Sequence, residues 1–284
     1  MTRQLTHHVT KKMTTGLPTL SSRQNFFWGK INRQVANIFR KPIANFDQLT
    51  VRALARNRQT QTTAGDLPFK FWPKDENWRS QPKPERSKGV DWSLIQLADQ
   101  TFGWLPNQYI VKQKSANYWE KIKLAPKNKL TPLLCPTPAK FKKILNQFKG
   151  VPYLWGGTTK AGMDCSAFTQ KLFFELGGIL LPRNSREQKK CGRAVDSTKS
   201  CLHAVARRAK ACPLDLLFFV HSTTGRHHVG VYWNDAVVYT RRSPQGEVWH
   251  FCLDKRGLST ESLDSMQKRY NHVATRRIFK LRNA

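Results

Sequence analysis

The chain of 284 residues is 39% hydrophobic and carries 49 Lys and Arg against 18 Asp and Glu, a formal net charge of +31. This apolar content is enough to build one large or two modest packed domains, which excludes a wholly disordered protein. No apolar run approaches the roughly 20 residues of a membrane-spanning helix, so no membrane span is expected. The excess of basic residues points to an anionic substrate or partner.

The basic residues are spread over the whole chain, without the spacing of a zinc finger, an RNA-recognition motif or a P-loop. We therefore expect no specific binding of nucleic acid. The six cysteines include no C-x-x-C pair, and neither a metal nor a cofactor is expected.

Residues 1–27 lack the continuous apolar stretch of a secretory signal and are expected to form a basic, flexible tail. An organellar transit peptide is the alternative that their basic, hydroxyl-rich composition leaves open. Without a secretory signal the protein is expected to be cytoplasmic with reduced thiols, or else exported by a non-standard route.

Short apolar segments that alternate with polar residues predict strands in the first part of the chain, at residues 35–39, 49–54, 69–72 and 92–97. They predict a small antiparallel barrel over residues 28–113, interrupted by an exposed loop at 79–89. Four prolines lie within or just after the segment 114–135, which is expected to be a linker. A second domain is expected over 136–284.

A cysteine stands at the predicted start of a helix in the second domain. A short helix at 140–148 is followed by a glycine-containing turn, and Asp164 then occupies the N-cap position before the apolar-periodic run 167–176. Cys165 therefore falls in the first turn, where free backbone N–H groups and the helix dipole favour a thiolate over a thiol. This position predicts a nucleophile.

Two adjacent histidines stand where a base for this thiol is needed. Strands predicted at 216–220 and 229–232 enclose a turn and bring His227 and His228 to the start of the second strand. Successive strand residues point to opposite faces, so only one of the two faces Cys165 and the other is expected to be exposed.

Five linked motifs, in this order, resemble the NlpC/P60 family of cysteine peptidases: Gly150–Gly157, Asp164–Ser166, Leu181–Gln188, Asp215–Phe219 and His228–Tyr232. The segments 35–42 and 92–106 resemble bacterial SH3 (SH3b) domains. The resemblance implies an α+β protein, with a papain-like NlpC/P60 domain preceded by a small all-β SH3b barrel. It implies hydrolysis of γ-D-glutamyl-diamino acid bonds in murein peptides, which are anionic.

The resemblance also assigns roles to individual residues. Cys165 matches the family's nucleophile, and His228 matches its general base. Five further residues match positions that shape the substrate site: Tyr153, Asp164, Ser166, Arg183 and Ser185. The Arg183 guanidinium is expected to pair with the α-carboxylate that a γ-linked D-glutamate leaves free. The basic residues between 188 and 215 are interpreted as a solvated insertion that also attracts such peptides.

The residue expected at the position that orients the catalytic histidine differs from the residue usual in the family. The strand expected at 236–240 aligns with the segment that supplies a second histidine, and Tyr239 stands there instead. A phenol stabilises an imidazolium less than a more basic partner does. Two other functions therefore stay open: a catalytically weakened protein that binds cell-wall polymers, and an amidase or acyltransferase of the same fold.

Overall fold

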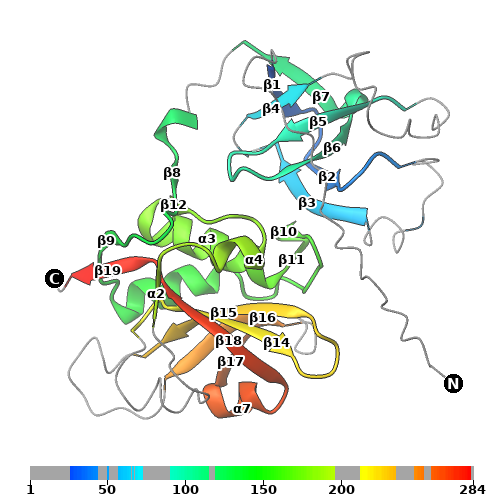
Figure 1. Ribbon diagram of the computed structural model, residues 1–284. Coiled ribbons are helices and arrows are strands. Elements are labelled where there is room, and N and C mark those ends of the chain that lie inside the picture. Colours follow the sequence, from blue (N-terminus) through cyan, green and yellow to red (C-terminus); the bar gives the residue numbers. More distant parts are fainter. Residues whose placement is uncertain are drawn as a thin grey trace, which may run out of the picture.

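The computed structural model describes residues 26–43, 50, 57–64, 66, 68–72, 90–114, 119–195, 212–234, 246–252 and 257–282. Within these ranges no helix has the length and apolar character needed to cross a membrane. The chain folds into an N-terminal antiparallel sheet and a larger unit of helices and strands (Figure 1).

The N-terminal sheet has the strand order β3-β2-β6-β5-β4-β1-β7, and each neighbouring pair is antiparallel. Its strands are β1 (Phe27–Ile31), β2 (Val35–Phe39), β3 (Arg58–Thr63), β4 (Phe69–Trp72), β5 (Trp92–Gln96), β6 (Phe102–Pro106) and β7 (Ile110–Gln113), with η2 (Asn107–Tyr109) before the last. Ile38, Ile95 and Leu105 are fully buried in its core.

Three of the four predicted strands in this region are confirmed, as β2, β4 and β5. The predicted strand at 49–54 and the loop at 79–89 lie outside the described residues, apart from Thr50. Strand β3 was not expected, because its sequence Arg-Gln-Thr-Gln-Thr-Thr has no apolar residue. Alternate residues of this strand are nevertheless buried.

The connection between the two units contacts both of them. In η3 (Trp119–Lys121) the indole N–H of Trp119 donates to the carbonyl of Pro68, 2.6 Å away. Further on, β8 (Lys123–Leu124) pairs in parallel with β12 (Ile179–Leu180), and β9 (Thr131–Leu134) with β19 (Phe279–Arg282). These backbone pairs fasten the connection to the C-terminal unit.

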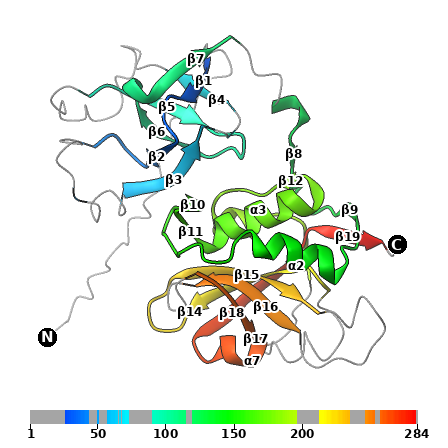
Figure 2. The ribbon, with the colours of Figure 1, turned by 180° about the vertical axis from the view of Figure 1, so that it is seen from behind.

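The C-terminal unit is built on a six-stranded sheet of order β13-β18-β14-β15-β16-β17. These strands are β13 (Arg193–Ala194), β14 (Leu216–His221), β15 (His227–Trp233), β16 (Glu247–Cys252), β17 (Gly257–Ser262) and β18 (Tyr270–Arg277). The helices α2 (Pro138–Asn146), α3 (Cys165–Gly177) and α4 (Ser185–Gln188) lie between this sheet and the N-terminal sheet, and α7 (Leu263–Gln267) lies on its far side (Figures 1 and 2).

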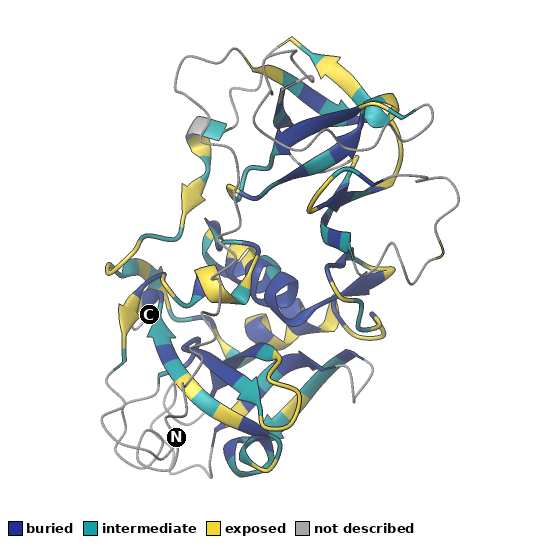
Figure 3. Cartoon of the chain, turned by 45° about the vertical axis from the view of Figure 1, so that its right-hand side comes forward, coloured by how far each residue is buried: buried dark blue, intermediate teal, exposed yellow. Residues whose placement is uncertain are grey.

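Helix α3 is buried along most of its length (Figure 3). Phe168, Leu172 and Phe173 are fully buried in the core against the six-stranded sheet. The helix ends at Gly178, whose φ of 64° is the left-handed conformation that favours glycine at this position. A hairpin of β10 (Thr158–Thr159) and β11 (Gly162–Met163) precedes the helix, and β10 lies against β3 (Figure 1).

Candidate functional site

Cys165 is the first residue of α3, as the sequence predicts, and Asp164 caps the helix. The Asp164 carboxylate accepts the N–H of Ala167 at 2.8 Å and the N–H of Gly156 at 2.9 Å. The backbone N–H groups of Val229 and Ser166 act on the Cys165 thiol by lowering its pKa, so both groups lie near it. Because Val229 follows His228 directly in β15, the thiol lies beside the strand position that carries the predicted base.

The expectation of a thiolate at rest is wrong for this environment. Cys165 is 4% exposed, and burial together with the negative charge of Asp164 raises its pKa to about 12. The two backbone N–H groups and Arg183 act in the opposite direction but are outweighed. A thiol at a helix N-terminus is thus held neutral when it is fully withdrawn from water and placed beside a carboxylate.

His228 begins a chain of three buried groups on adjacent strands. Its Nε2 lies 2.8 Å from Nδ1 of His250 on β16, and Nε2 of His250 lies 3.1 Å from Oε1 of Glu261 on β17. Glu261 also accepts hydrogen bonds from Nη2 of Arg269 at 2.6 Å and from the hydroxyl of Ser265 at 2.8 Å. His228 is 6% exposed and His250 is fully buried.

This chain fixes which nitrogen of each imidazole carries a proton. Hydrogen bonds from His250 and Arg269 lower the pKa of Glu261, so its carboxylate is an acceptor and Nε2 of His250 donates. The Nδ1 of a neutral His250 then accepts, so Nε2 of His228 donates. The lone pair of His228 is left on Nδ1, the nitrogen that can take a proton from a thiol.

Tyr239, which the sequence analysis assigns to this third position, lies outside the described residues. In the structure, Nδ1 of His250 contacts Nε2 of His228. Sequence reasoning missed His250 because it aligned the segment at 236–240 with this strand. The segment Glu247–Cys252, with the sequence Glu-Val-Trp-His-Phe-Cys, forms β16. Its β-branched and aromatic residues around His250 were the sequence signal for a strand that carries a second histidine.

The remaining predicted residues lie at or near the helix start. Tyr153 is partly buried and pairs through its backbone with Met163, just before Asp164. Burial and the charges of Cys165 and Asp164 raise the pKa of its phenol. Ser185 is the first residue of α4, and His227 is more exposed than His228, as the alternation of the strand predicts.

Arg183 and Asp164 form a buried ion pair behind the helix start. Nη2 of Arg183 lies 2.7 Å from Oδ2 of Asp164, and the other bonds of the guanidinium go to Oδ1 of Asp164, Oγ of Ser166, the carbonyl of Gly157 and Oγ1 of Thr60. A guanidinium has five N–H donors, so all of them are used. The expectation that Arg183 binds a substrate carboxylate is therefore not supported, because no donor is left for it.

The N-terminal sheet supplies part of this cluster through β3. Thr60 accepts the Nε–H of Arg183 at 2.8 Å, and Nη1 of Arg58 donates to the carbonyl of Trp155 at 3.0 Å. The side chain of Gln61 accepts the backbone N–H of Thr158 at 3.2 Å. Sequence reasoning missed these residues, because a strand without apolar side chains shows no alternation of hydrophobicity.

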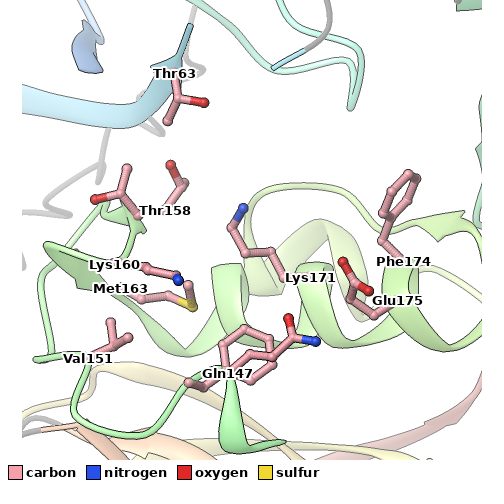
Figure 4. A pocket seen from close by; sticks show the side chains of 11 residues that line it. Thr63, Gln147, Val151, Thr158, Lys160, Met163, Lys171, Phe174 and Glu175 are labelled. Carbon is pink, nitrogen blue, oxygen red and sulfur yellow. The ribbon is translucent and has the colours of Figure 1, made fainter. Parts of the chain in front are cut away.

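A cavity of about 400 Å³ lies beside the site, between β3 and helices α2 and α3 (Figure 4). Thr63 approaches it from the N-terminal sheet, while Lys171 and Glu175 of α3 and Met163 of β11 line it from the other side. Cys165, His228 and His250 do not line this cavity. The cavity is therefore separate from these three side chains, although Thr158, which contacts Gln61 of β3, lies in its lining.

The perturbed pKa values predict how stability depends on pH. Burial, together with the neighbouring His250 and Arg269, lowers the pKa of His228 well below 6.5, so below this pH the unfolded chain binds a proton that the folded protein does not. The raised pKa of Cys165 acts at the other end, because the unfolded thiol loses its proton near pH 9 and the folded one near 12. The free energy of unfolding, measured with urea, should therefore be largest between about pH 6.5 and pH 9.

The alkaline part of this profile has a direct control. Replacement Cys165→Ala removes one of the retained protons, so the slope above pH 9 should decrease by about 1.4 kcal/mol per pH unit. An unchanged slope in this variant would show that the thiol is not held neutral in the folded protein.

A buried thiol at a helix start, placed next to a strand that carries a hydrogen-bonded histidine, is the arrangement of a cysteine hydrolase. Residues 150–276 match the model of the NlpC/P60 family. Cys165, His228, His250 and Glu261 all lie within this segment.

Two curated proteins are similar to part of this chain. The murein DD-endopeptidase MepS/murein LD-carboxypeptidase of Escherichia coli (strain K12) is 40% identical over 93 residues, which are 32% of this chain and 43% of that protein. The gamma-D-glutamyl-L-lysine dipeptidyl-peptidase of Bacillus cereus (strain ATCC 10987 / NRS 248) is 38% identical over 117 residues, 39% of this chain and 31% of that protein. The chain thus matches less than half the length of these relatives.

The solved structure of an NlpC/P60 family protein from Bacillus cereus ATCC 10987 is similar in fold. It has a TM-score of 0.53 and 19% sequence identity, and the similarity covers 89% of this chain and 99% of that one. The similarity therefore extends over both the N-terminal sheet and the C-terminal unit.

Proposed function

We propose that this protein is a cysteine peptidase that hydrolyses γ-D-glutamyl bonds to a diamino acid in murein peptides. The observation that carries the proposal is the buried thiol of Cys165 beside the β15 position of His228, whose imidazole is oriented by His250 and Glu261. The names of the two curated relatives, a murein endopeptidase and a γ-D-glutamyl-L-lysine peptidase, support the choice of substrate. The net charge of +31 suits an anionic peptide.

In the proposed reaction the resting pair is a neutral thiol and a neutral imidazole. As Sγ of Cys165 attacks the γ-carbonyl carbon, Nδ1 of His228 takes the thiol proton, and the resulting imidazolium gives it to the departing amine. Water then attacks the thioester with His228 as the base, which releases the γ-carboxylate and restores the thiol. Backbone N–H groups at the start of α3 are the donors for the oxyanion.

The N-terminal sheet is assigned, as part of this proposal, to the SH3b type. Its seven antiparallel strands and the similarity of fold over 89% of the chain support the assignment. In this position the sheet forms a wall beside the helix start, through Arg58, Thr60 and Gln61.

Synthetic L-Ala-γ-D-Glu-L-Lys tests the proposed reaction. Incubation with the protein is expected to release L-Ala-D-Glu and L-Lys, identified by mass spectrometry. The isomer with an ordinary α-peptide bond at glutamate serves as the control and should stay intact. Release from neither peptide would contradict the proposed function, and equal release from both would contradict the γ-specificity.

The alternative of a weakened, wall-binding protein rested on Tyr239 as the partner of His228. Because His250 makes that contact, this reason for the alternative no longer holds.

His250 and Tyr239 are expected to differ strongly in their effect on the reaction. Replacement His250→Phe removes the acceptor for Nε2 of His228, so the neutral imidazole is free to take the wrong tautomer. We expect kcat to decrease by about 100-fold or more, within the range typical of lost acid–base catalysis. Tyr239→Phe is the matched control and should change kcat less than about twofold. The reverse result would restore Tyr239 as the orienting residue.

A further inference from the structure

Arg183 cannot supply the positive group that a γ-linked glutamate requires, because its five donors are used inside the protein. A γ-peptide bond leaves the α-carboxylate of that glutamate free and negatively charged. Burial of a carboxylate in a binding site is costly unless a charged donor is provided for it. The site therefore needs another cation.

Arg58 of β3 is a second buried guanidinium near the helix start. It is 5% exposed, although it stands at the first position of a strand that belongs to the N-terminal sheet. Its Nη1 donates to the carbonyl of Trp155, and its Nε is buried without a hydrogen-bond partner. A buried N–H without an acceptor costs about 1–3 kcal/mol, so such a group calls for an explanation.

The backbone around Gly156 connects Arg58 with the nucleophile. Gly156 has a φ of 71°, and a side chain on it would lie 3.0 Å from Cδ of Arg58, so the stem of the arginine occupies the space that the glycine leaves. The N–H of the same glycine donates to Asp164, which caps the helix at Cys165. Only this one turn of backbone separates the arginine from the cap of the catalytic helix.

We propose that Arg58, supplied by the N-terminal sheet, binds the free α-carboxylate of the γ-linked residue in an acidic peptide substrate. This inference rests on the proposed function and names a specificity residue for it. A guanidinium pairs with a carboxylate through two parallel N–H donors, and the unpartnered Nε provides one of them. The protein should then distinguish glutamate from its α-amide, isoglutamine.

The test compares two peptides, L-Ala-γ-D-Glu-L-Lys and the same peptide with the α-carboxylate converted to an amide. The wild-type protein should cleave the carboxylate form with a kcat/KM about 10-fold or more above that of the amide, a ratio typical of a charged hydrogen bond. In Arg58→Gln the kcat/KM for the carboxylate should fall by about 10-fold or more, mainly through KM, while that for the amide stays within about twofold. Arg58→Lys keeps the charge but loses the planar fork, and should lie between them.

Arg40→Gln is the matched control, since Arg40 is an exposed arginine of the same sheet and its loss changes the net charge equally. It should leave the preference for the carboxylate unchanged. Equal losses for both peptides in Arg58→Gln and Arg58→Lys, or no loss in either variant, would overturn the proposal and leave Arg58 as a purely structural contact between the two units.

Binding to the Cys165→Ala variant, measured by calorimetry, separates this inference from the proposed reaction. If the wild-type protein cleaves neither peptide, the proposed function fails, and the affinities of the two peptides still decide the role of Arg58. Tighter binding of the carboxylate form that disappears with Arg58→Gln supports the inference. Equal affinities of the two peptides, or binding of neither, overturn it.

Discussion

Replacement Cys165→Ala is expected to abolish hydrolysis of the γ-D-glutamyl peptide while the protein stays folded. The thiol is the only atom group that the change removes, and a cysteine-to-alanine change leaves the backbone of α3 and its cap at Asp164 in place. Loss of the nucleophile should lower kcat by at least about 10⁴-fold. Product release followed by chromatography measures the loss, and circular dichroism checks the fold.

Cys191→Ala is the matched control for this experiment. Cys191 is buried to a similar extent, and its thiol contacts the carbonyl of Glu187 on α4. Its replacement should leave kcat within about twofold of the wild type, because it takes no part in the reaction. Equal loss of activity in the two variants would show that the effect comes from disturbed packing, and full activity of Cys165→Ala would remove the thiol from the mechanism.

The second large effect is expected on stability, from the buried pair of Asp164 and Arg183. Asp164→Asn keeps the size of the side chain but leaves the Arg183 guanidinium without its carboxylate partner, at a position where the arginine is 2% exposed. Removal of one partner from a buried ion pair typically costs about 3–5 kcal/mol. Unfolding in urea should show a loss of this size, together with loss of activity because the cap of α3 is weakened.

The pair of Lys190 and Glu187 provides the comparison, because both side chains are about half exposed. Glu187→Gln should change the free energy of unfolding by no more than about 1 kcal/mol, as is usual for surface pairs. If Asp164→Asn costs no more than this control, the pair with Arg183 contributes little and the carboxylate acts mainly as a helix cap.

The sequence predicts the parts of this protein that depend on local patterns. The cap at Asp164, the helix that begins at Cys165 and the strand that carries His228 all follow from neighbouring residues, and the structure confirms them. The resting state of the thiol could not be predicted in this way. Its pKa depends on complete burial by segments that are far away in the chain.

Local sequence patterns also could not predict which side chains contact the candidate site residues. His250 reaches His228 through the pairing of β15 with β16, and the register of two strands is a tertiary property. Arg58 and Thr60 belong to a strand of polar residues that contacts Trp155 and Arg183 of the C-terminal unit. A sequence pattern gives residue types in order, whereas these contacts depend on how separate elements dock.

The bond between Thr60 and Arg183 joins residues 123 positions apart. Through this bond, Thr60 of the N-terminal sheet contacts the arginine that pairs with Asp164, the residue that caps α3. Contacts between distant parts of a chain form late in folding, because the entropy of closing a long loop must be overcome first. The cluster of Thr60, Arg183 and Asp164 should therefore be among the last parts of the molecule to assemble, after both sheets exist.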